Sequence, residues 1–264
     1  MNPNAFQDVV KGARKTVFIH VTAGDAGLGA GWGGRKRPFY LARENGALQA
    51  IRFMADADKA PIKNSEGSAT FNGHLVFRER YGNAVSYFLR LPDGGTGAGF
   101  EGTGFQSLKR FASGKIDAMF AVDGSTSYQG WKDLVDTVRD IVTFERGHSP
   151  LAQINVADLD PAINPHDHAD HLMTAHLALD AVKDMTCVRR VFYVDYASSG
   201  MPANLNAQDR DMKSAVFAVT LDGVIDFDHR TSWNHYDRAY IGRDYFRAQE
   251  PAGNCTGTAV AGQP

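Results

Sequence analysis

The chain has 264 residues, of which 43% are hydrophobic and 22% are charged, and its formal net charge is −2 at pH 7. This length fits one large α/β domain or two small ones. The weak net charge gives no electrostatic reason to expect a nucleic-acid partner, and no apolar run approaches the roughly 18–20 residues that cross a bilayer. The first residues lack the apolar stretch of a signal peptide, so we expect a soluble chain, cytoplasmic by default.

The chain opens with a predicted helix where an α/β protein usually opens with a strand. Residues 2–15 predict a short amphipathic helix, and 16–21 predict a buried strand. A glycine-rich loop over 22–34 follows, and then a helix over 37–56. Because a parallel α/β sheet normally begins with a strand, this order indicates a missing strand ahead of the first helix.

The rest of the chain alternates between strands and helices. Strands are expected at 74–79 and 84–91 as antiparallel neighbours, then at 152–156 and 189–197, and helices at 105–114, within 125–147, at 171–185 and at 207–223. This alternation predicts an α/β fold with a mostly parallel sheet and helices on both faces. We expect one domain over residues 1–250 and a flexible tail over 251–264.

The stretch "NPHDHADH", residues 164–171, holds three of the nine histidines. It lies between a predicted strand and a predicted helix, where open α/β sheets bind their ligands. His168 and His171 are three residues apart, so they face the same side of a helical turn. Neutral imidazole is a zinc ligand, and catalytic zinc sites take three protein ligands and a water. The alternative is a solvated turn in which an aspartate caps the helix.

A competing motif lies earlier in the chain. "GAGFEG", residues 97–102, matches the dinucleotide-binding pattern, with Asp123 about twenty residues further on. The glycines do not directly follow a strand, and in a chain with 27 glycines the match is weak support for an NAD- or FAD-binding oxidoreductase. The two cysteines, Cys187 and Cys255, leave their pairing and the redox compartment open.

Several motifs together resemble the LmbE-like or PIG-L-like zinc de-N-acetylases, which include the N-acetylglucosaminyl-phosphatidylinositol deacetylases. "HADH" is similar to the H-P-D-H motif of that family, and "VFIHVTAGDAG", "YLARENGALQAI" and "FLRLPDGG" are similar to its other motifs, in the same order over residues 17–195. The resemblance implies a Rossmann-like three-layer sandwich. It also implies a zinc-dependent hydrolase that removes an N-acetyl group from a sugar or related small molecule.

The resemblance assigns roles to five residues. His168 would stabilise the oxyanion or protonate the leaving amine, His171 would bind zinc, and Asp170 would orient its neighbours within the catalytic site. Asp93 and Arg43 would lie toward the substrate. Their alternatives are a turn residue for Asp93 and a solvated helix face for Arg43.

Two other residues near these motifs have simpler interpretations. Asp25 would line the mouth of the pocket or cap the following segment, and His20 would be a core histidine. Aromatic residues near the late loops could form a sugar platform or belong to the core; they are Trp233, Tyr236 and Tyr240.

One half of the family's zinc site is absent from this sequence. The A-H-P-D-D-type motif, which supplies one histidine ligand, one aspartate ligand and the general base, would stand just before residue 2. We therefore expect a family member that is truncated at its N-terminus and lacks the first strand of the sheet. A non-catalytic descendant with a carbohydrate pocket is the alternative, and the oligomeric state stays open.

Overall fold

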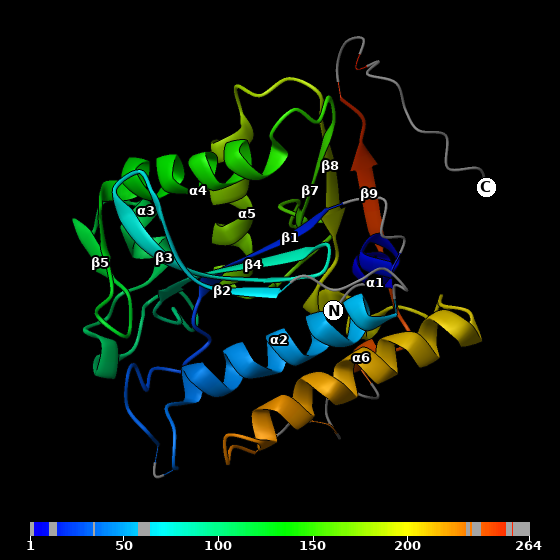
Figure 1. The fold of residues 1–264 in the computed structure, drawn as a ribbon, viewed down its shortest axis with the longest axis horizontal. Helices are drawn as coiled ribbons and strands as arrows, with labels where there is room; N and C mark the ends of the chain where they lie inside the picture. Colours follow the sequence, from blue (N-terminus) through cyan, green and yellow to red (C-terminus); the bar gives the residue numbers. More distant parts are fainter. Residues whose placement is uncertain are drawn as a thin grey trace.

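The chain forms a mixed α/β fold in which helices lie on both sides of the strands (Figure 1). The computed structural model describes residues 3–10, 15–33, 35–57, 64–230, 233, 239–251 and 255. The helices are α1 (Pro3–Val10), α2 (Phe39–Asp56), α3 (Leu108–Ala112), α4 (Gly130–Arg146), α5 (Ala169–Val182) and α6 (Ala207–Ile225), with short 3-10 helices η1 (Glu101–Thr103) and η2 (Tyr196–Gly200). The strands are β1 (Thr16–Thr22), β2 (Asn64–Phe71), β3 (His74–Tyr81), β4 (Ala84–Leu91), β5 (Ala118–Phe120), β6 (Ser127–Gln129), β7 (Ala152–Ala157), β8 (Val188–Tyr193) and β9 (Phe246–Gln249).

The strands form three sheets where the sequence predicts one that is mostly parallel. The first sheet has the order β1-β4-β3-β2, the second is the pair β5-β6, and the third has the order β7-β8-β9. Among the described strands, only β1 with β4 and β7 with β8 pair in parallel, and the other pairs are antiparallel. The α/β class is therefore confirmed, whereas the mostly parallel sheet is not found.

Tight turns explain the antiparallel part of the first sheet. Asn72 and Gly73 join β2 to β3, and both have positive φ, as a two-residue hairpin turn requires. A second short turn at 82–83 joins β3 to β4, so the two strands pair antiparallel as expected. Strand β2 is absent from the sequence prediction, and the Asn-Gly pair is the signal that identifies it.

The first sheet separates two hydrophobic layers. On one side the largest cluster joins Tyr87 and Leu89 of β4 to Leu134 and Ile141 of α4. On the other side a second cluster brings α1, α2 and α6 together around Val9, Met54 and Val216, among others. Burial of these side chains stabilises the fold by roughly 1.5–3 kcal/mol for each large one.

Two parallel strands each present an edge with no second partner among the described residues. Strand β1 pairs only with β4, and β7 pairs only with β8. In β1 the apolar side chains of Val17, Phe18 and Ile19 are half-buried, whereas nearly every residue of the neighbouring β4 is buried. Parallel strands are usually buried on both faces, so this exposure marks β1 as an incompletely covered strand.

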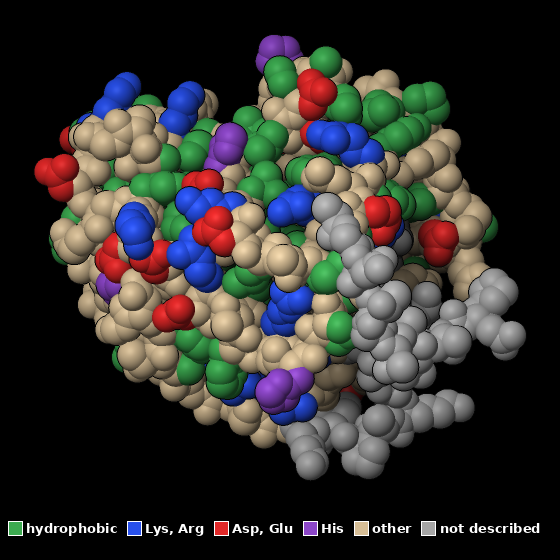
Figure 2. All heavy atoms as spheres, turned by 90° about the horizontal axis from the view of Figure 1, so that it is seen from above, with side chains coloured by type: hydrophobic (Ala, Val, Ile, Leu, Met, Phe, Trp, Pro, Cys, Tyr) green, Lys and Arg blue, Asp and Glu red, His purple; other side chains and the backbone are tan. Residues whose placement is uncertain are grey.

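The surface and the chain ends add four observations. Figure 2 shows one face on which Lys and Arg side chains are interspersed with Asp and Glu, in keeping with the small net charge. Within the described residues, no helix has the length and hydropathy needed to span a membrane. Cys187 and Cys255 form a disulfide, which answers the pairing that the sequence left open. Most of the expected flexible tail lies outside the described residues.

Candidate functional site

The candidate site lies where several strands end. Strand β7 ends at Ala157, and a loop leads from it to α5, while β4 and β8 end close to Asp93 and Asp195. In α/β folds, side chains at the carboxyl ends of strands converge on one edge of the sheet. The histidine cluster therefore meets carboxylates from distant parts of the chain.

The start of α5 sets the positions of both histidines. His168 is the N-cap residue, and its Nδ1 accepts a hydrogen bond from the Asp170 N–H at 3.2 Å. This contact satisfies one of the amides that a helix leaves unpaired at its start. His171 lies one turn further on, and the centroids of the two imidazole rings are 5.3 Å apart. The structure therefore brings His168 and His171 to the same side, as their spacing predicts.

His171 lies between two carboxylates. Its Nδ1 is 2.8 Å from Oδ1 of Asp167 and 3.6 Å from Oδ2 of Asp195. Burial alone would lower the pKa of His171, but the hydrogen bond to Asp167 and the nearby negative charges raise it. Each of the three residues offers a ligand atom within 4.8 Å of the others, so they could hold a metal ion. We call Asp167, His171 and Asp195 the His171 group.

Asp167 also connects the two histidines. Its fully buried side chain accepts the His168 N–H at 2.7 Å on the same oxygen that contacts His171. Burial would raise the pKa of Asp167, but its hydrogen bonds, above all that with His171, lower it. Asp167 thus supplies the hydrogen bond to His171, whereas Asp170, the predicted orienting residue, contacts His168 instead.

Asp170 belongs to a second group with Asp93 and His168. These three residues also offer ligand atoms within 4.8 Å of one another, and we call them the His168 group. Asp170 is 5% exposed, and its Oδ2 accepts the Gly94 N–H at 2.8 Å. Its Oδ1 is buried and has no hydrogen-bond partner among the described residues. Burial raises the pKa of Asp170 to about 7, whereas burial and the nearby His171 lower the pKa of His168.

A buried carboxylate holds Asp93 in place. Asp25, which is fully buried, accepts the N–H of Asp93 and the N–H of Gly29, both at 2.7 Å. Asp25 therefore connects the two glycine-rich loops, and both of its oxygens are used by backbone amides. Arg43 is exposed at the pocket wall and belongs to neither group. Its side chain packs close to Gly24, where a Cβ added to the glycine would lie 3.2 Å from Nε of Arg43.

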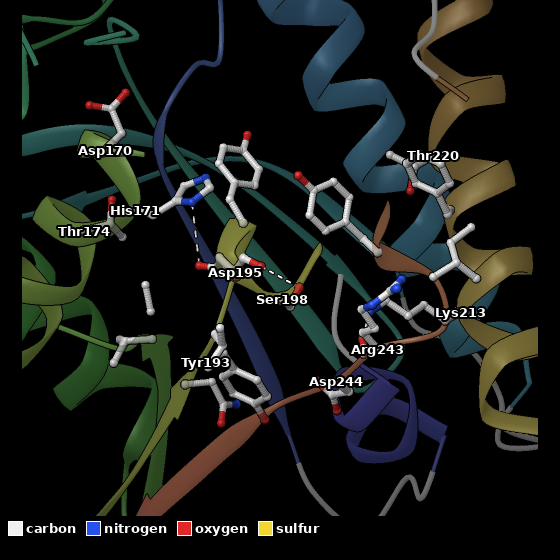
Figure 3. Close-up of a pocket in the computed structure, with 18 of the residues that line it drawn as sticks. Asp170, His171, Thr174, Tyr193, Asp195, Ser198, Lys213, Thr220, Arg243 and Asp244 are labelled. Atoms are coloured by element: carbon white, nitrogen blue, oxygen red, sulfur yellow. Dashed lines mark hydrogen bonds and ion pairs between the residues drawn. The ribbon is translucent and has the colours of Figure 1, made fainter. Parts of the chain in front are cut away.

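A cavity of about 600 Å³ opens beside the His171 group. Its wall includes Asn155 of β7, Thr22 of β1 and Thr220 of α6, so it lies between the two incompletely paired strands. Figure 3 shows His171 and Asp195 on one side of this space and Lys213 with Arg243 across from them. Burial lowers the pKa of Lys213, whose ammonium donates to the Arg243 carbonyl.

Three residues of this site are absent from the sequence prediction: Asp167, Asp195 and Asn164. Asn164 is buried, donates to Oδ2 of Asp167 at 3.0 Å and accepts the Asp195 N–H at 3.2 Å. It therefore fixes the two carboxylates of the His171 group relative to each other. The position of Asp195 directly after a buried strand is the signal that could have identified it.

The residues of the competing predictions have other partners. Asp123 forms an ion pair with Arg90 at 2.6 Å, and α3, which follows the "GAGFEG" loop, is only five residues long. His20 stacks on Phe88 with ring centroids 4.4 Å apart, and burial lowers its pKa to about 4, as fits a core histidine.

The three aromatic residues proposed for a sugar platform do not share one environment. Trp233 stacks on Phe217, Tyr240 lines the cavity, and Tyr236 lies outside the described residues. The platform therefore stays a prediction, and of the two described residues Tyr240 is the one that lines the cavity.

Comparison with known proteins gives no family. No family model matches this chain, and no curated protein or solved structure matches it. The functional argument therefore depends on the arrangement of the residues described above.

Proposed function

We propose that the chain is a zinc-dependent hydrolase that removes an N-acetyl group from an N-acetylated sugar or a related small amide. One observation supports this most: His171 lies between Asp167 and Asp195 at the wall of a cavity that is large enough for a small molecule. One imidazole with two carboxylates is a donor set that zinc accepts.

The residues around the His171 group support the proposal. Zinc, when bound, lowers the pKa of a water and polarises the amide carbonyl. A zinc ion held by Asp167, His171 and Asp195 would bind Nδ1 of His171, the nitrogen that both carboxylates face. The His168 group lies one turn away, where positive charge or a proton donor would stabilise the carbonyl oxygen or the leaving amine.

Arg43 and Asp93 would contact the polar groups of the substrate. The exposed guanidinium of Arg43 lines the cavity and has no hydrogen-bond or ion-pair partner within the part of the chain that the structure describes. Asp93 is half-buried beside His168. Both contacts depend on the resemblance to the de-N-acetylases and stay proposals.

We further propose the finer architecture, a Rossmann-like sandwich in which one more parallel strand lies between β1 and β7. The half-exposed apolar face of β1 and the cavity between the two strands support this strand. Such a strand would unite the two parallel pairs in one sheet.

The zinc content of the purified chain tests the function. We expect tightly bound zinc that His171→Ala removes and release of acetate from N-acetylglucosamine that the same change abolishes. His176→Ala is the matched control, because His176 is an exposed histidine on the same helix. Zinc that is retained in His171→Ala would contradict the proposal. A wild-type chain without zinc and without activity would favour the non-catalytic alternative.

A further inference from the structure

We infer that the His168 group, Asp93, His168 and Asp170, is a second divalent-cation site next to the His171 group. This inference rests on the proposed function and deepens it. The positive charge that the reaction needs beside the His171 group would then come from a cation held by His168 and its neighbours.

Each side chain of this group has one donor atom in a backbone hydrogen bond and a second donor atom left over. Ligand atoms of the three side chains lie within 4.8 Å of one another. His168 uses Nδ1 to cap α5, and Asp93 uses Oδ1 to accept the Gly95 N–H at 2.8 Å. Among the described residues, His168 Nε2 and Asp93 Oδ2 have no hydrogen-bond partner.

The buried oxygen of Asp170 is the independent observation that points to a ligand. Asp170 is only 5% exposed, yet its Oδ1 has no hydrogen-bond partner among the described residues. Its other oxygen already accepts the Gly94 N–H. A buried carboxylate oxygen without a partner costs free energy, and a cation that binds there would offset this cost. One imidazole and two carboxylates suit Zn²⁺ and Mn²⁺.

The two groups are close enough to act on one substrate. The rings of His168 and His171 are 5.3 Å apart, and the same oxygen of Asp167 contacts the His171 ring and the His168 backbone. Two-metal hydrolase sites hold their ions roughly 3.5–4 Å apart, so that both can contact the reacting group. The arrangement of the two groups is compatible with such a pair.

The test is a zinc titration of metal-stripped protein, followed by calorimetry and by elemental analysis of the bound metal. We expect two zinc ions per wild-type chain and one per Asp93→Asn chain, with the affinity of the remaining ion changed less than about threefold. Asp160→Asn is the matched control, because Asp160 is exposed and accepts the N–H two residues ahead, as Asp93 does. This control should keep both ions.

A second variant protects the test against misfolding. His168→Asn keeps a side chain that can cap α5 and removes the imidazole, so it should also lose one ion. One zinc per wild-type chain, with the same affinity in Asp93→Asn, would overturn the second site and leave the proposed function intact. No bound zinc in the wild-type chain would overturn both. One zinc that Asp93→Asn removes and His171→Ala retains would support the His168 group and contradict the role of His171.

Discussion

Two regions near the end of β4 bury carboxylates. In one region the carboxylates are paired with an arginine, and in the other a carboxylate oxygen has no described partner. In the first, Arg90 donates to both oxygens of Glu44, at 2.7 and 2.8 Å, and to Asp123 at 2.6 Å. In the second, the His168 group, one oxygen of Asp170 has no hydrogen-bond partner among the described residues. The two regions come from similar residue types and share the strand β4 and the segment that follows it.

The difference separates a structural cluster from a functional one. The Arg90 guanidinium also lies 4.8 Å from the ring centroid of Phe77. Its N–H groups therefore bind carboxylates while its planar face packs on an aromatic ring. Such a cluster holds α2 and the β5–β6 turn against β4. The Asp170 carboxylate, in contrast, is buried at a cost that no described residue fully compensates, and sites of this kind are typical of ligand binding and catalysis.

The largest expected effect comes from breaking the compensated cluster. Arg90→Met leaves the buried carboxylate of Glu44 without its partner and should lower the free energy of unfolding by about 3–5 kcal/mol. Urea unfolding measures the loss. Arg80→Met, which changes an exposed arginine on β3, should have little effect. A loss below about 1 kcal/mol for Arg90→Met would show that the cluster is no more than a surface ion pair.

The second prediction concerns the uncompensated carboxylate and its dependence on pH. The pKa of Asp170 is about 7 in the folded chain and 3.8 in an ordinary environment. Between these values the folded chain keeps a proton that the unfolded chain loses, so the stability of the metal-free protein should fall as the pH rises. Below about pH 4 and above about pH 7 this carboxyl should add no further change.

Asp170→Asn should remove this dependence. The variant and the wild type should be similar near pH 4, and the variant should be more stable at pH 8 by up to about 4 kcal/mol. Unfolding curves in the presence of a chelator measure the difference. The exposed Asp160→Asn control should give a difference that does not vary with pH. If the advantage of Asp170→Asn failed to grow with pH, Asp170 would have a partner that keeps it ionised.

A smaller effect should follow from filling the space beside Asp170. A Cβ on Gly94 would meet Oδ1 of Asp170 at 2.6 Å and the Cβ of Ser107 at 2.8 Å. Gly94→Ala should therefore displace the carboxylate and cost about 1–3 kcal/mol of unfolding free energy. Gly67→Ala is the control, because a Cβ there meets no atom within 4 Å. Equal stability of the two variants would show that Asp170 moves aside freely.

The sequence predicts the helices, including the short α1 and α3, and the strands with an apolar pattern, and it misses the short or exposed strands. The helices α2, α4, α5 and α6 and the strands β1, β3, β4, β7 and β8 occur close to their predicted positions. Strand β9 is exposed along its whole length and β5 has three residues, so neither has an apolar pattern to detect. The sheet arrangement depends on hairpin turns and on contacts between distant strands, which periodicity does not report.

The candidate site is likewise predictable only in part. The shared side of His168 and His171 follows from helical spacing. The partners do not, because Asp93 and Asp195 reach the histidines through the fold, and the direction of Asp167 depends on the turn that precedes α5. Which carboxylate contacts which imidazole is therefore a property of the tertiary structure.

The carboxylate of Asp25 has a consequence for motion. It binds backbone amides of both glycine-rich loops, so a displacement of one loop is transmitted to the other. The first loop exposes Leu28 and Trp32, and the second contains Asp93. The backbone position of Asp93 therefore depends on the conformation of the outer loop, because one buried side chain holds both.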